Sequence, residues 1–165
     1  GKERSITMAA PTRIELERFD EGGPGVAYFE TGQAAEGNSQ SADYRVDESV
    51  DTTNTQLNGH VFEGEWLEYT TDIAAGTFDL TLYRKWGSTN AGVRVLIGES
   101  NAATEFTVLG EVRGEGVAHP SGEGQLVTLH NVEVSESQAG TNRVIRLEIL
   151  DNWMGLDYLD FTPVS

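Results

Sequence analysis

The fold is decided by residues 64–71, GEWLEYTT, and residues 76–84, GTFDLTLYR. Apolar side chains take every second position in both stretches: Leu67 and Tyr69 in the first, Phe78, Leu80 and Leu82 in the second. A period of two predicts strands with one buried face. The short connection at 74–76, Ala-Ala-Gly, predicts a hairpin at the centre of an all-β core.

Working outward, alternating or apolar runs separated by turn signals predict further strands. These runs cover 13–19, 92–98, 105–110, 126–134, 144–150 and 156–161. The chain shows no helical pattern longer than a turn and no internal repeat. Short strands with Gly-rich turns between them predict an all-β fold, a β-sandwich (jelly roll) of two antiparallel sheets.

The 165 residues have the length of one domain. Residues 1–12 lack periodicity, so we expect a linker or a non-native remnant there and a single β-sandwich domain over 13–165. Residues 20–58 are rich in Gly, Ser, Gln, Asn and Asp. A loop region of this length in a compact domain is usually functional.

Composition excludes several classes of function. The chain has no Cys, which excludes disulfides, thiolate metal sites and a Cys nucleophile. A net charge of −16 argues against nucleic acid as a partner, because the phosphate backbone requires a basic stripe. No apolar run approaches a membrane span, and we expect no membrane partner. No signal peptide is recognisable, so a secreted source would make this an excised mature domain. We expect a monomer.

Several stretches resemble family 6 carbohydrate-binding modules. The resemblance rests on GEWLEY at 64–69, AGTF at 75–78, the Tyr83-Arg84 pair, IELE at 14–17 and LDYLDF at 156–161. It extends from Arg13 to Phe161 in the order and spacing of the family. It implies a β-sandwich that is attached to a secreted polysaccharide-degrading enzyme and binds glycans without cleaving them.

Carboxylates near the two ends of the chain form the first candidate site. Glu15 and Glu17 share one face of the first predicted strand, and Asp157 and Asp160 lie in the last. If these strands are neighbours, the carboxylates converge, and hard oxygen ligands suit Ca²⁺. The alternative is that all four are solvated. The resemblance implies a structural Ca²⁺ between the strands. Its ligands would be Glu15, Glu17, the carbonyl of Arg45 and Asp157, with Asp157 favoured over Asp160.

Loop aromatics form the second candidate site. Flat rings of Tyr44, Trp86 and Trp153 can stack on the apolar faces of sugars at little entropic cost, with Tyr28 and Phe29 in reserve. The resemblance implies a cleft between loops at one edge of the sandwich, with hydrogen bonds from Asn152 and Glu30.

The sequence departs from the family pattern around this cleft. Residues 121–125 lack the usual loop tryptophan, and Gly155 stands where the family has Asn. Trp86, Asn152 and Trp153 are the candidates for those roles. Trp66 lies inside a strand and is predicted to be framework.

Catalysis is the first competing function. A glycosidase needs two opposed carboxylates, and among 27 acidic residues some pair will always look suitable. The chain has no Gly-x-Ser-x-Gly nucleophile motif, and His60, His119 and His130 lack the spacing of metal ligands. A calcium-stabilised structural or adhesion module is a further alternative, since it needs no aromatic cleft.

We therefore predict a secreted, non-catalytic module whose partners are a polysaccharide and a catalytic domain in the same chain. The run YRVDESVDT at 44–52 resembles modules of enzymes that degrade agar and other marine galactans. Agarose is accordingly the predicted ligand and an agarase the predicted parent enzyme, with xylan and β-glucans as alternatives.

Overall fold

The computed structural model describes residues 12–16, 28–29, 63–86, 88–99, 105–114, 124–152 and 154–164. For Tyr28, Phe29 and Trp86 it describes the backbone alone. These residues form nine strands: β1 Thr12–Glu15, β2 Tyr28–Phe29, β3 Trp66–Ile73, β4 Gly76–Trp86, β5 Gly92–Gly98, β6 Thr107–Arg113, β7 Gly124–Val134, β8 Gly140–Ile149 and β9 Met154–Pro163. None of the described residues forms a helix that is long and apolar enough to cross a membrane.

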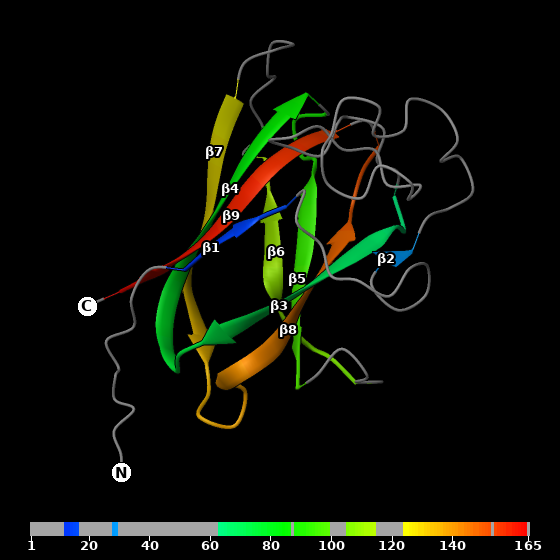
Figure 1. Ribbon diagram of the computed structural model, residues 1–165. Coiled ribbons are helices and arrows are strands. Elements are labelled where there is room, and N and C mark those ends of the chain that lie inside the picture. The colour runs from blue at the N-terminus through cyan, green and yellow to red at the C-terminus, as the bar shows by residue number, and fades with distance from the viewer. Residues whose placement is uncertain are drawn as a thin grey trace.

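The strands build two antiparallel sheets that pack face to face as a β-sandwich, which confirms the predicted fold class (Figure 1). Sheet A has the order β1-β9-β4-β7, and sheet B has the order β2-β3-β8-β5-β6. In Figure 1 the first strand, in blue, lies beside the last strand, in red.

The predicted hairpin at residues 74–76 is wrong. β3 pairs with β2 and β8 in sheet B, whereas β4 pairs with β7 and β9 in sheet A. The connection therefore crosses from one sheet to the other. Alternation identified the buried face of each strand correctly but carries no information about which strand lies beside it.

The core lies between the sheets and takes the predicted apolar faces. Leu67 and Tyr69 face inward from sheet B, and Phe78, Leu80 and Leu82 face them from sheet A, all nearly inaccessible to solvent. The Phe78 ring meets the Phe161 ring edge-on, with centroids 5.9 Å apart. Burial of these faces supplies the main favourable term in folding.

Strand boundaries differ from the predicted ones by a few residues. β1 begins at Thr12, one residue inside the predicted linker, while β8 begins at Gly140, before the predicted start of that strand at residue 144. β6 runs from Thr107 to Arg113, later than the predicted 105–110. Terminal residues of strands are weakly specified by alternation because polar and apolar positions both occur there.

Candidate functional site

The strand directions gather several connections at one end of the sandwich, which we call the loop end. β4, β6 and β8 end there, and β3, β5, β7 and β9 begin there. Backbone hydrogen bonds link its turns: the Leu150 amide donates to the Gly92 carbonyl at 3.0 Å, and the Gly114 amide donates to the Ala91 carbonyl at 2.9 Å. The loop end thus has a fixed backbone framework.

Polar side chains strengthen this framework around Asn152. The Ser88 hydroxyl donates to one oxygen of the Asp151 carboxylate. The backbone amide of Asn152 donates to the other Asp151 oxygen at 2.8 Å. The Asn152 side-chain oxygen accepts from the Glu63 backbone amide at 2.8 Å. Asn152, a predicted sugar ligand, is exposed at the loop end, and its side-chain oxygen is used to hold the approach to β3.

The register of β4 against β9 sets the predicted site residue Trp86 opposite the start of β9. Trp86 is the Cα partner of Met154, the residue after Trp153, and Asn152 precedes Trp153. The backbone therefore brings the end of β4 and the start of β9 to the same edge. Trp153 itself lies outside the described residues, as do the predicted site residues Glu30 and Tyr44.

A buried arginine lies beneath the loop end. Arg84 is 0% exposed and occupies the inward face of β4, on the same side as Leu80 and Leu82. A Cβ added to Gly114 would fall 2.5 Å from an Arg84 guanidinium nitrogen and 2.0 Å from the Thr89 carbonyl oxygen, so this position has no room for a side chain. Burial lowers the pKa of Arg84, and the nearby Asp151 charge opposes that shift.

The sequence pattern indicates that Arg84 faces inward but does not indicate what the side chain does there. Its parity in β4 matches the apolar positions, but arginine is almost never fully buried without partners. A guanidinium nitrogen and the Thr89 carbonyl oxygen both lie close to the Gly114 backbone. It therefore belongs to the scaffold of the loop end.

The predicted metal ligands lie at the border of β1 and β9. These strands are antiparallel neighbours, with Glu15 opposite Tyr158 and the Leu16 amide donating to the Asp157 carbonyl at 2.9 Å. Glu15 and Asp157 are therefore adjacent in the sheet, as the calcium hypothesis requires. Glu17 and Arg45, the other two predicted ligands, lie outside the described residues.

The electrostatics of Asp157 fit a cation at this border. Burial raises the pKa of the Asp157 carboxyl above its usual value, and the charges of Lys85 and Arg13 offset part of that shift. A desolvated carboxylate gains free energy from an added positive charge, and Ca²⁺ prefers such oxygen ligands. The described residues alone contain no cluster of three or more metal-ligating side chains.

Asp160, the carboxylate that the sequence argument set aside, has another partner. Arg13 donates to its two oxygens at 2.7 and 2.9 Å. The Arg13 guanidinium also lies over the Tyr158 ring, 3.7 Å from its centroid. Asp160 is thus engaged with Arg13 on the outer face of sheet A.

The outer face of sheet A also carries an aromatic pair that the sequence did not predict. Tyr83 and Tyr158 stack with centroids 5.4 Å apart and an interplanar angle of 23°. Leu126, 58% exposed, is the Cα partner of Tyr83 on β7. The sequence places both tyrosines at outward positions of predicted strands. Whether they are neighbours depends on the β4–β9 register, which the sequence pattern does not give.

Comparisons with families and curated proteins give no match, whereas solved structures do. The chain is similar to a family 6 carbohydrate-binding module from Clostridium stercorarium in complex with cellobiose, with TM-score 0.56 and 15% identity over 93% of this chain and 94% of that one. It has the β-sandwich fold of such modules.

Two further solved structures of carbohydrate-binding modules share this fold. The C-terminal family 6 module of a marine laminarinase from Zobellia galactanivorans matches with TM-score 0.53 and 16% identity, over 93% of this chain and 99% of that one. A family 36 module in complex with calcium and xylotriose matches with TM-score 0.50 and 14% identity, over 92% and 99%. All three are described as binding modules, and the likeness at these identities establishes the shared fold.

Proposed function

We propose that the chain is a non-catalytic carbohydrate-binding module of the family 6 type, which directs an attached glycoside hydrolase to a polysaccharide. The observation that carries the proposal is the β4–β9 register, since it brings the Trp86 backbone and Met154, at the start of β9, to one edge of the sandwich. The shared fold supports it, because binding modules of both compared families use this sandwich.

In the proposed cleft, Tyr44, Trp86 and Trp153 stack on sugar rings, and Asn152 and Glu30 form hydrogen bonds to hydroxyls. The hydrogen bonds among Ser88, Asp151, Asn152 and Glu63 hold these four residues together before a ligand arrives. Such pre-organisation lowers the entropic cost of binding. Stacking without ion pairing gives modest affinity, about 5–7 kcal/mol, or roughly 10–100 μM.

Agarose is the proposed ligand, and a secreted agarase is the proposed parent enzyme. This choice rests on the resemblance of residues 44–52 to modules of galactan-degrading enzymes. Xylan and β-glucan are the competing ligands, since the compared modules include one solved with cellobiose, one solved with xylotriose and one from a laminarinase. A neutral ligand implies binding that depends little on salt.

We further propose that Ca²⁺ stabilises the module between β1 and β9. Glu15, Glu17 and Asp157 supply carboxylates, and Arg45 supplies a carbonyl. The raised pKa of the partly buried Asp157 carboxyl supports a cation there.

Affinity electrophoresis over agarose, carrageenan, xylan, laminarin and cellulose tests the binding function. We expect retardation by one neutral polysaccharide, loss of it in Trp153→Ala and Tyr44→Ala, and retention in the control Tyr83→Ala. Melting temperatures of the two loop variants should match the wild type. If Tyr83→Ala loses binding and both loop variants retain it, the ligand lies on the outer face of sheet A. Release of reducing ends would instead establish a hydrolase.

A further inference from the structure

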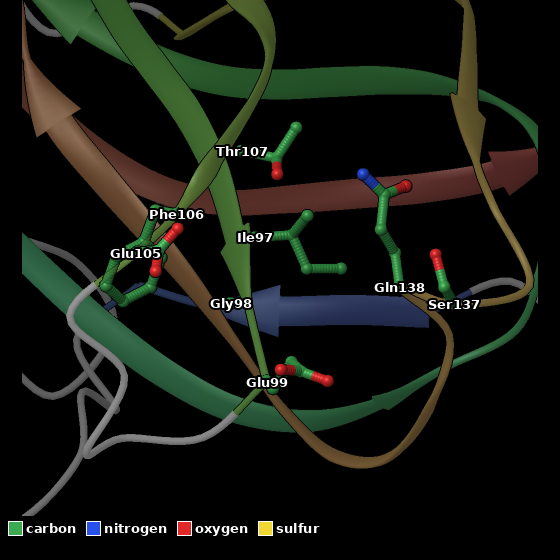
Figure 2. A pocket seen from close by; sticks show the side chains of 8 residues that line it. All are labelled: Ile97, Gly98, Glu99, Glu105, Phe106, Thr107, Ser137 and Gln138. Atoms are coloured by element: carbon green, nitrogen blue, oxygen red, sulfur yellow. The ribbon is translucent and has the colours of Figure 1, made fainter.

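A pocket of about 410 Å³ opens at the end of the sandwich opposite the loop end. It lies between the end of β5, the start of β6 and the turn that joins β7 to β8 (Figure 2). Its lining comprises Ile97, Gly98, Glu99, Glu105, Phe106, Thr107, Ser137 and Gln138. Asn152, the residue of the proposed cleft whose side chain the structure describes, does not belong to it.

The pocket combines hydrogen-bonding groups with an apolar wall. Figure 2 shows the side chains of Ser137 and Gln138 on one side and those of Glu105 and Phe106 on the other, with Ile97 between them. Carboxylates accept hydrogen bonds, and hydroxyls and the amide both donate and accept. This mixture matches a ligand with several hydroxyl groups and an apolar face.

The charges of the lining exclude anionic ligands. Among the residues that the structure describes, the lining contains two glutamates and no lysine or arginine. Two described cations lie close by: Arg143 reaches Glu99 at 3.8 Å, a long ion pair with a strongly exposed carboxylate, and the Arg146 guanidinium packs against the Phe106 ring. Both carboxylates therefore remain accessible as acceptors for neutral donors, and charge-assisted hydrogen bonds are about twice as strong as neutral ones.

Two walls of the pocket are held in place by contacts outside it. The Phe106 ring packs against the Arg146 guanidinium, 4.2 Å from the ring centroid, and a Cβ on Gly98 would lie 2.7 Å from the same ring. The Gln138 side-chain oxygen accepts from the Ser135 amide at 2.8 Å. A ligand would thus meet a largely pre-formed surface, which favours binding.

We propose that this pocket is a second carbohydrate site, which takes a neutral mono- or disaccharide unit. Its volume falls in the range of about 300–1,000 Å³ typical of small-molecule sites. The inference rests on the proposed function and extends it: the two ends of the sandwich engage separate segments of polysaccharide. Two linked sites raise the apparent affinity for a polymer without new contacts.

Backbone amide chemical shifts of the ¹⁵N-labelled chain test the pocket directly. The probes are neoagarohexaose, xylohexaose, laminarihexaose and cellohexaose, each titrated at low and high salt. We expect one of them to shift two separate groups of amides, Gly98, Thr107 and Gln138 in the pocket and Ser88 and Asn152 at the loop end. Trp153→Ala should abolish the second group of shifts and leave the first.

Glu105→Gln supplies the matched test of the lining. We expect it to weaken binding at the pocket about tenfold through loss of a charged acceptor, with an unchanged melting temperature. The control Glu136→Gln removes an exposed carboxylate next to Ser137 that does not line the pocket, and it should bind as the wild type does. Equal titration curves for the two variants would overturn the assignment.

The same titrations separate this inference from the proposed function. Shifts confined to the loop end overturn the second site and leave the proposed function intact. Shifts confined to the pocket overturn the loop-end cleft and support the second site. Absence of shifts with every probe overturns both. Methylammonium chloride is the last probe: if it shifts the pocket amides and the sugars do not, the pocket binds cations and the assignment fails.

Discussion

Each sheet carries an arginine that lies over an aromatic ring and pairs with a carboxylate on the neighbouring strand, but in different surroundings. On sheet B, the Arg146 guanidinium lies 3.8 Å from the Trp66 ring centroid and bonds to Glu68 at 2.5 and 2.7 Å. On sheet A, Arg13 lies over Tyr158 and bonds to Asp160 at closely similar distances. The Arg146 and Glu68 side chains are 22% and 1% exposed, against 50% and 23% for Arg13 and Asp160.

The two clusters differ in burial, and Arg146 bonds to one oxygen of Glu68 whereas Arg13 bonds to both oxygens of Asp160. A surface ion pair contributes about 0–1 kcal/mol because water and salt screen it. Removing one member of a buried pair costs much more, because the remaining charge stays desolvated. The sheet B cluster is therefore predicted to hold the fold, while the edge of sheet A depends on other interactions, among them the proposed Ca²⁺.

The largest expected effect comes from removing Arg146. Arg146→Met should lower the free energy of unfolding by about 3–5 kcal/mol, because Glu68 loses a cation in a buried position. Arg13→Met, the matched variant, should lower it by about 0–1 kcal/mol. Urea unfolding at neutral pH measures both.

A second substitution separates charge from packing. Glu68→Gln in the Arg146→Met background should recover part of the loss, since it removes the buried charge. If Arg146→Met and Arg13→Met destabilise the fold equally, burial does not distinguish the clusters and the comparison fails.

Removal of Ca²⁺ is the next largest expected effect. A metal that binds the folded chain alone stabilises it by about 2.7 kcal/mol at a hundredfold excess over its dissociation constant. Excess chelator should therefore lower the melting temperature of the wild type, and Glu17→Ala should abolish the difference. An unchanged melting curve for metal-loaded protein after chelation would refute the calcium site. The Arg146 cluster serves as reference, since its effect should not depend on Ca²⁺.

Tyr69 gives a smaller effect that tests how β1 is tied to sheet B. Its buried hydroxyl donates to the Leu16 carbonyl at 2.7 Å, next to the proposed ligand Glu15. Tyr69→Phe leaves that carbonyl without this donor, at a cost of about 1–3 kcal/mol. We also expect weaker calcium binding, measured by calorimetry, because the end of β1 loses an anchor. If Tyr69→Phe lowers the free energy of unfolding by the expected amount and leaves the calcium affinity unchanged, the metal lies elsewhere.

The sequence predicted strands better than partners. Apolar alternation is a local property of the sequence, and it correctly predicted two buried strand faces. Their members are Leu67, Tyr69, Phe78, Leu80 and Leu82. The assignment of their strands to different sheets is a property of the whole chain, so the hairpin prediction failed at residues 74–76. The same limit applies to the Tyr83–Tyr158 stack, which depends on the β4–β9 register.

Charged residues mark the other limit of prediction. Glu68 alternates with Leu67 and Tyr69, which predicts a solvated position, yet it is buried beside Arg146. For Glu15 and Asp157, the sequence predicted proximity on the condition that the first and last strands are neighbours. The structure meets that condition, because β1 pairs with β9. Glu17, Glu30, Tyr44, Arg45 and Trp153 lie outside the described residues, and their roles stay predictions.

The smallest expected effect concerns Asp79 on the exposed face of sheet A. The Asn131 amide donates to its carboxylate at 3.0 Å, and His130 lies 3.1 Å away. The hydrogen bond from Asn131 is the main cause that holds the pKa of the Asp79 carboxyl below its usual value, and His130 acts in the same direction. The matched variant is Asp79→Asn, which keeps an acceptor oxygen and removes the charge.

The sign of the effect follows from linkage. A carboxyl whose folded pKa is depressed contributes stability above its unfolded pKa, about 3.9, and loses that contribution as the pH falls through the folded value. Asp79→Asn should therefore be slightly less stable than the wild type at pH 7, and the difference should shrink as the pH falls below about 4. Urea unfolding of both proteins in calcium-free buffer measures this difference without the titration of metal ligands. A difference that stays constant with pH would show that the acceptor oxygen, and not its charge, matters at this exposed position. The charges of sheet A would then contribute even less than the comparison with Arg146 predicts.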